Sequence, residues 1–191
     1  MNNFKRHLGK FIGQLSEEEI ETILSYFEII TVKKKEVLQE ADMLCDKLFF
    51  VEQGCLRSYY MKANGVEQTI DFAIENWWLT DNMAFEHKSN SGFYIQSVEK
   101  SLVLTITKDN FSALLVSHPI MEKYYRQVFQ RAYAAAQYRL KYLYEFSREE
   151  LYFHFEERFP EFIQRIPQYL MASYLGFSPE YLSEIKKKRF S

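Results

Sequence analysis

The C-terminal stretch from Pro167 to Ser191 constrains the fold of this chain more than any other. Pro167 suits the start of a helix, because its missing N–H falls where no intrahelical partner exists. Apolar side chains follow at helical spacing, at Leu170, Ala172 and Leu175. Gly176 permits the left-handed turn that ends such a helix, and Ser178 with Pro179 provides an N-cap and a first-turn proline for a second one. The stretch is therefore predicted to be a helix-turn-helix.

The predicted second helix has a packing side and an outward side. Tyr181, Leu182 and Ile185 are expected to pack on the first helix. Short polar and acidic side chains near the helix start reach base edges of DNA, while the basic run 186–189 neutralises phosphates. The candidate DNA-binding residues are Ser178, Pro179, Glu180, Tyr181, Ser183, Glu184, Lys186 and Lys187. The alternative interpretation is an ordinary helix pair followed by a solvated basic tail.

Composition limits what the rest of the chain can be. With 191 residues, 47% of them hydrophobic and 17% aromatic, the chain suffices for one large or two small packed domains. The formal charge of −2 excludes a globally basic coat for nucleic acid, so any DNA contact must be local. From residue 160 onward five Lys or Arg residues accompany three Glu residues, so the positive charge gathers where the helix-turn-helix is predicted.

Several other classes of protein are disfavoured by the residues that are present. Cys45 and Cys55 are too few and too widely spaced for a zinc or iron–sulfur framework, which favours two reduced core thiols over a redox pair. No ligand spacing connects the histidines, so we expect no metal and no iron–sulfur cluster. No signal peptide and no apolar run of about 18 residues is found, which predicts a cytoplasmic protein without membrane contact. No nucleophile and base, phosphate loop or paired ligands suggest an enzyme.

The first two thirds of the chain carry helix and strand patterns in turn. Ser16 and Glu19 form a capping box at the start of an amphipathic helix over 15–27. Short strands are then expected at 28–32, 36–39, 47–52, 56–61, 67–72, 93–99 and 101–107. Asn64-Gly65 is typical of a type I′ hairpin turn, since both residues tolerate a positive φ. The pattern predicts an α+β fold that begins with a small β roll of the jelly-roll type.

A long helix is predicted after a short one over 109–115, running from Pro119 to about Tyr144. Its apolar seam comprises Phe129, Tyr133, Ala136, Leu140 and Leu143. At 1.5 Å per residue the helix would be about 39 Å long, too long for so small a roll to bury. A homodimer that pairs through this seam is therefore expected. The alternative is a helix that lies across its own β domain and uses the seam within the chain.

The remaining elements complete a division into three segments. Ser147 is a plausible N-cap for a helix over 148–158, and Pro160 ends that helix. We predict an effector-sensing β roll at 1–118, a dimerisation helix at 119–146 and a DNA-binding helix-turn-helix at 147–191.

This order of elements resembles the layout of the cyclic-AMP receptor protein (Crp/Fnr) family of bacterial transcription regulators. The most similar stretches are 50–59, like the family's strand and glycine turn, and 167–178, like its DNA-binding helix pair. The resemblance implies a homodimeric, sequence-specific DNA-binding regulator whose β roll senses an effector. It also brings RNA polymerase and a small-molecule effector into consideration as partners.

The chain departs from the family at the nucleotide site. Members that bind a cyclic nucleotide carry a Gly-Glu pair for the ribose hydroxyl and, some ten residues on, an Arg-Ser or Arg-Thr pair for the phosphate. Here Asn-Trp-Trp-Leu at 76–79 and Ser91-Gly92 stand in these places. A buried phosphate without a guanidinium would go unpaired, so the chain resembles a branch that does not bind cyclic AMP.

An aromatic pocket is the candidate replacement for the nucleotide site. Its residues would be Trp77, Trp78, Phe85, Phe93 and Tyr94, with Gln137 near the place from which family members touch the ligand. The alternative is an aromatic core or dimer contact without a ligand. The effector therefore stays unknown.

The predicted DNA-contacting helix departs from the family as well. Pro179-Glu180 and Glu184 stand where such regulators often present arginines, although Glu180 is still able to accept a hydrogen bond from a cytosine amino group. The alternative function is therefore a ligand-binding or protein-interaction module that has lost specific DNA binding.

Overall fold

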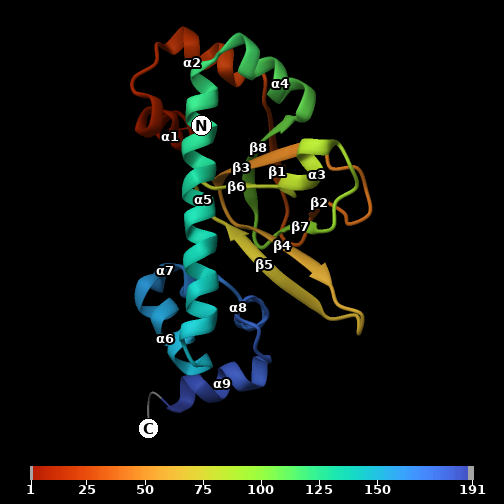
Figure 1. Cartoon of the computed structure of the whole chain (residues 1–191), viewed down its shortest axis with the longest axis vertical. Coiled ribbons are helices and arrows are strands. Elements are labelled where there is room, and N and C mark those ends of the chain that lie inside the picture. The colour runs from red at the N-terminus through yellow and green to blue at the C-terminus, as the bar shows by residue number, and fades with distance from the viewer. Residues whose placement is uncertain (1, 189–191) are drawn as a thin grey trace. The chain divides into compact units, whose positions relative to one another are not determined.

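The computed structural model describes residues 2–188 and divides into two compact units, whose elements are labelled in Figure 1. Within the described residues the first unit comprises 2–60 and 70–129, and the second comprises 61–69 and 130–188. The long helix α5 (Ile120–Glu145) therefore contributes its first part to one unit and the rest to the other. Each unit is described separately below.

Two antiparallel four-stranded sheets form the β roll. One sheet has the order β1 (Glu28–Val32), β8 (Ser101–Thr107), β3 (Lys47–Gln53) and β6 (Trp78–Leu79), and the other β2 (Val37–Gln39), β7 (Tyr94–Ser97), β4 (Leu56–Met61) and β5 (Glu67–Ala73). The prediction of a roll of short strands is confirmed. The two residues of β6 were not predicted to be a strand, because so short a segment shows no alternation.

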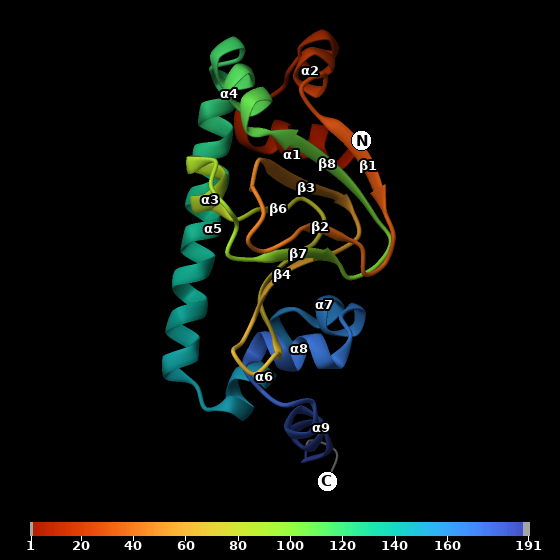
Figure 2. The same cartoon turned by 90° about the vertical axis from the view of Figure 1, so that its right-hand side faces the viewer.

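Strand β3 divides the core of the first unit into two clusters. Leu48 and Phe50 belong to the cluster that the helices cover, whereas Phe49 and Val51 belong to the cluster between the two sheets. This follows from the period of two in a strand, which sends successive side chains to opposite faces. Helices α1, α2 and α4 gather at one end of the roll, as Figure 2 shows.

The first turns of α5 are fixed to the roll by aromatic side chains. Tyr124 and Tyr125 are buried, and the ring of Tyr125 lies 5.2 Å from that of Trp78 and 4.7 Å from that of Phe111. The indole N–H of Trp78 donates to the Tyr124 hydroxyl at 3.0 Å, and His7 Nδ1 lies 2.7 Å from the same oxygen. Burial raises the pKa of Tyr124 well above that of a free tyrosine, so this hydroxyl stays neutral.

Helix α1 (Asn2–Ile12) was not predicted, and its N-terminus is held by a distant carboxylate. Glu52 of β3 is buried and accepts hydrogen bonds from the backbone N–H groups of Asn3 and Phe4, both at 2.9 Å. The first N–H groups of a helix lack intrahelical partners, so Glu52 supplies what a local N-cap would. Sequence patterns near residue 2 contain no sign of a partner that lies 48 residues away.

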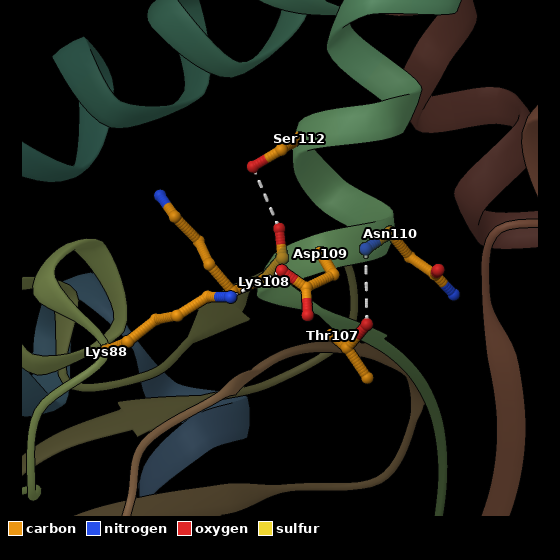
Figure 3. A network of polar contacts seen from close by, with 6 residues as sticks. All are labelled: Lys88, Thr107, Lys108, Asp109, Asn110 and Ser112. Carbon is orange, nitrogen blue, oxygen red and sulfur yellow. Dashed lines mark hydrogen bonds and ion pairs between the residues drawn. The ribbon is translucent and has the colours of Figure 1, made fainter.

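Three of the predicted helices begin at a local cap. Ser16 caps α2 (Glu17–Leu24) and Ser147 caps α6 (Arg148–Arg158), each in a complete capping box, and the cap holds the pKa of Glu19 and of Glu150 below the usual range. Thr107 caps α4 (Lys108–Ser117) by accepting from the Asn110 N–H at 3.2 Å (Figure 3). Among residues 2–188 no helix is both long and apolar enough to cross a membrane.

Two short helices were not predicted, namely α3 (Asn82–His87) and α7 (Pro160–Arg165). Each has six residues, which is too short for an apolar periodicity to emerge from the sequence. Both cysteines are free and buried, as expected for core thiols, and burial raises the pKa of Cys45.

The hairpin between β4 and β5 corrects the predicted turn type. Gly65 has a φ of 78°, but Asn64 does not adopt a positive φ, so the turn is not of type I′. The N–H of Gly65 donates to the carbonyl of Lys62 at 2.8 Å, and the N–H of Lys62 donates to the carbonyl of Val66 at 2.9 Å. Three residues therefore form the loop, with glycine as its one left-handed member.

We predict that Gly54→Ala destabilises the fold far more than Gly65→Ala. Gly54 has a φ of 109°, and an added Cβ would lie 2.7 Å from the Cα of Ser101, whereas Gly65 has open space around it. Gly65→Ala should lower the free energy of unfolding by about 1 kcal/mol through its positive φ alone. Gly54→Ala should lower it by about 2 to 4 kcal/mol, because the backbone of β8 must also move. Urea unfolding measures both, and equal values would contradict this account of the turn.

Candidate nucleic-acid interface

Helix α8 (Gln168–Leu175) is the first helix of the predicted pair and lies in the second unit. Pro167 is its N-cap, one residue before the helix that it was expected to open. Gly176 ends the helix in the left-handed region, with a φ of 77°, and the N–H of Phe177 donates to the carbonyl of Ala172 at 2.8 Å. The predicted glycine turn is confirmed.

Helix α9 (Pro179–Lys188) follows at once. The Ser178 hydroxyl accepts from the N–H of Tyr181 at 3.1 Å, which is the predicted N-cap, and Pro179 is the first helical residue. Leu182 and Ile185 are buried, and α8 and α9 pack on each other. The helix-turn-helix is therefore present in the described part of the chain.

The outward side of α9 brings together five of the eight predicted DNA-binding residues. They line one open hollow on the surface and are Pro179, Glu180, Ser183, Glu184 and Lys187. Their spacing in the sequence places them on a single helix face. Two carboxylates and one ammonium group share this face, so its own charge does not attract phosphate strongly.

The other predicted DNA-binding residues have different surroundings. Ser178 caps the helix, and Tyr181 packs edge-on against Phe177 with ring centroids 5.6 Å apart. The Arg148 guanidinium lies 5.8 Å from the centre of the Tyr181 ring. Lys186 is half-buried. These side chains contribute to the packing of the helix pair, and their contact with DNA stays a prediction.

The basic run at the end of the chain is only partly directed outward. Lys188 forms an ion pair with Glu149 of α6 at 2.5 Å, and this partner raises the pKa of Lys188. This ion pair connects the end of α9 to α6. It also engages the ammonium group of Lys188, which was predicted to contact phosphate. Arg189 lies outside the described residues.

A contact between α8 and the β4–β5 hairpin was not predicted. Within the second unit, the Ser173 hydroxyl donates to the carbonyl of Glu67 at 2.9 Å and accepts from the N–H of Thr69 at 2.9 Å. The Gln68 side-chain amide donates to the Ser173 carbonyl. The hydroxyl therefore bridges a donor and an acceptor on one strand edge, and three residues of β5 hold the first helix of the pair.

The predicted dimer seam is exposed within the chain. Exposed fractions are 36% for Phe129, 66% for Tyr133, 53% for Leu140 and 44% for Leu143, and Ala136 is exposed as well. The dimer itself stays a prediction.

The residues of the predicted effector pocket lie in different surroundings. Trp78 and Phe85 pack in the helix-covered core, and Tyr94 stacks on Tyr59 with ring centroids 5.0 Å apart. Trp77 is 45% exposed, and Gln137 is exposed on the part of α5 that belongs to the second unit. Phe93 is half-buried. The core contacts agree with the structural alternative for Trp78 and Phe85, and the pocket stays a prediction.

One residue near the expected nucleotide site was missed in the sequence. Asp81 is buried and caps α3, since its Oδ1 accepts from the N–H of Ala84 at 3.1 Å. Its Oδ2 accepts from the Ser91 hydroxyl at 3.2 Å and from the N–H of Gly92 at 3.0 Å. An Asp three residues before an N–H that it caps is a recognisable signal, but its second oxygen contacts a loop that only the fold brings near.

Comparison with known proteins identifies this architecture. Residues 29–118 match the family model of the cyclic nucleotide-binding domain. No curated protein sequence matches the chain. Similar solved structures include the catabolite activator protein of Thermus thermophilus, with 19% identity, a TM-score of 0.58 and coverage of 95% of this chain and 85% of that chain.

Two further structures share the fold. FixK2 from Bradyrhizobium japonicum has 14% identity and a TM-score of 0.67 over 85% of this chain and 83% of that chain. The c-di-GMP responsive global regulator CLP of Xanthomonas campestris has 11% identity and a TM-score of 0.67 over 91% of each chain. The resemblance to Crp/Fnr regulators and the predicted α+β fold are confirmed.

We predict that Ser173→Ala loosens the hairpin from α8. The variant removes the hydroxyl that bridges the backbone of Glu67 and Thr69. Thr69 is fully buried, so its N–H would lose its partner, and the free energy of unfolding should fall by about 1 to 3 kcal/mol. Amide hydrogen exchange at Thr69 should become faster. Ser183→Ala, on the outward side of α9, is the matched control and should change stability by less than about 0.5 kcal/mol. Unchanged exchange at Thr69 would show that the bridge does not hold the strand.

Proposed function

We propose that the chain is a homodimeric, sequence-specific DNA-binding transcription regulator whose β roll senses an effector other than cyclic AMP. The observation that carries the proposal is the capped helix-turn-helix, in which α9 presents a single outward face. The match to a cyclic nucleotide-binding domain and the similarity to solved regulators support it.

The exposed seam on α5 supports the homodimer. Large apolar side chains recur along one side of this helix and are in contact with solvent in the single chain. A second copy that pairs through the same residues would cover them, and the two-fold symmetry would present two copies of α9. Two such helices reach successive major grooves when they lie about 34 to 36 Å apart, so the DNA sites should be palindromic.

Base reading would come mainly from short and acidic side chains. Glu180 is exposed near the start of α9, where a carboxylate accepts a hydrogen bond from a cytosine amino group. Phosphate contacts would come from Lys186 and Lys187 near the end of α9. One copy of such an interface would give a modest affinity for DNA. The dimer would be needed because it binds through two copies of α9.

A second candidate function is a protein-interaction module of the same architecture. The observation that favours it is the pair of carboxylates, Glu180 and Glu184, on the outward face of α9. These two carboxylates would repel the phosphates of DNA, whereas a basic surface on a protein partner would complement the carboxylates. Binding of a protein partner without any retention of DNA would decide for this alternative. We propose no enzymatic activity.

We predict that Lys186→Ala/Lys187→Ala weakens DNA binding and flattens its salt dependence. A dimer would lose four phosphate contacts, which should lower the slope of log Kobs against log salt by about 3 to 4. The control is Lys33→Ala/Lys34→Ala, which removes two exposed lysines in the loop between β1 and β2. Gel shifts on sites selected from random DNA measure both. An equal slope in the variant and the wild type would contradict the assigned interface.

We predict that Tyr133→Glu/Leu140→Glu separates the dimer. The two carboxylates would have to be buried at the seam, which is unfavourable without partners. Tyr138→Glu is the matched control, because Tyr138 is 58% exposed and lies on the opposite side of α5 at 100° per residue. Analytical ultracentrifugation should report a monomer for the double variant and a dimer for the wild type and the control. A monomeric wild type would sink the homodimer.

A further inference from the structure

Helix α1 is joined to the first turns of α5 by a buried hydroxyl that has two partners. The Tyr124 hydroxyl accepts the indole N–H of Trp78 at 3.0 Å and lies 2.7 Å from Nδ1 of His7 on α1. The Tyr124 ring also packs edge-on against Phe11, with centroids 5.7 Å apart, and the side-chain amide of Gln127 donates to the Phe11 carbonyl at 3.4 Å. Figure 2 shows α1 beside this part of α5. The contact therefore contains a polar link among aromatic rings.

The direction of each hydrogen bond follows from what the three groups are able to donate. An indole N–H only donates, so the phenolic oxygen of Tyr124 is the acceptor toward Trp78. When the phenol donates its own hydrogen to Nδ1 of His7, every hydrogen in the network has an acceptor. Among the described residues the hydroxyl has no other acceptor, so a hydrogen on Nδ1 would leave the phenol hydrogen buried and unbonded. The docked helix thus requires a neutral imidazole whose Nδ1 carries no hydrogen.

The surroundings of the ring also disfavour a charge. Tyr124 is fully buried and His7 is 9% exposed, so an imidazolium there would be removed from water. Burial raises the pKa of Tyr124 and of Tyr125, so both phenols stay neutral, and Glu52 of β3 accepts two backbone N–H groups at the start of α1. Charged groups of α1 and of its partner on α2 reach solvent and are Lys5, Arg6, Lys10 and Glu17.

We propose that His7 makes α1 a pH-sensitive latch on α5. With a neutral imidazole the hydrogen bond to Tyr124 forms and α1 stays docked, whereas a hydrogen on Nδ1 breaks this bond and α1 opens. The chemical signal that the latch reads is the proton concentration. The latch lies in the first unit and its test uses no DNA, so it stands or falls separately from the proposed function.

The sign of the pH response follows from the two states of α1. A solvated imidazole takes up a proton near pH 6.5, whereas the docked ring of His7 resists the proton. The open state therefore binds more protons than the docked state at mildly acidic pH. Docking is complete above this pH and weakens as the pH falls, because the state that binds more protons is favoured by acid.

Nuclear magnetic resonance of the histidine rings in the full chain tests the hydrogen-bond assignment. At pH 7.5 the ¹⁵N shifts should show a neutral His7 with its hydrogen on Nε2, and the signal is identified by its absence from His7→Asn. His87, which is exposed on α3, gives the reference titration. A hydrogen on Nδ1 of His7 at this pH, or a charged ring, would overturn the proposal.

Amide hydrogen exchange over residues 2–12 measures the opening of α1. Between pH 7.5 and 5.5, after correction for the intrinsic exchange rate, protection in the wild type should fall by about tenfold, which is the response of one imidazole that titrates near pH 6.5 only when open. His7→Asn offers an amide oxygen in place of Nδ1 and takes up no proton, so it should lose this response. His87→Asn is the matched control and should keep it.

Three results would contradict the latch. They are unchanged protection of the wild type, an equal loss in His7→Asn, and a His7 ring that becomes charged while residues 2–12 keep their protection. The third result is read from the wild type alone, so the proposal stays testable when His7→Asn does not fold. The His7 signal is then assigned by elimination with variants at the other histidines, His87, His118 and His154.

Discussion

Strand β3 is buried on both faces, and the first unit is arranged to satisfy that constraint. Phe50 faces the helices and Phe49 faces the space between the sheets, so the strand needs a sheet on one side and helices on the other. Either face left in water would expose several large apolar side chains, each worth about 1.5 to 3 kcal/mol when buried. The first turns of α5 complete the cover through Tyr124 and Tyr125, which tie the long helix to the roll.

Two buried acidic side chains join separate segments of the first unit. Glu52 satisfies the first N–H groups of α1, and Asp81 joins the start of α3 to the loop at Ser91 and Gly92. Both carboxylates accept hydrogen bonds from backbone N–H groups, and Asp81 accepts one more from the Ser91 hydroxyl, which offsets the cost of removing them from water. The roll therefore holds α1 to β3 and α3 to the loop at Ser91 and Gly92 through carboxylates of its own.

The helix-turn-helix depends on contacts from outside its own sequence. Ser173 of α8 is bridged to the backbone at Glu67 and Thr69, and Lys188 of α9 is paired with Glu149 of α6. These contacts fix the helix pair but take one lysine from the outward side. The charge that remains on the face of α9 is mixed, with two carboxylates and one ammonium group.

The sequence by itself determined the elements whose signals are local. The capping boxes at Ser16 and Ser147, the turn at Gly176 and the alternation of the strands predicted the β roll, the long helix and the helix pair. Only the tertiary structure decided the roles of Glu52, Asp81 and Ser173 and the packing of Trp78 and Phe85 in the helix-covered core. The reason is that a cap, a turn or a pleat joins residues a few positions apart, whereas these contacts join segments 10 to 106 residues apart that only the completed fold brings together.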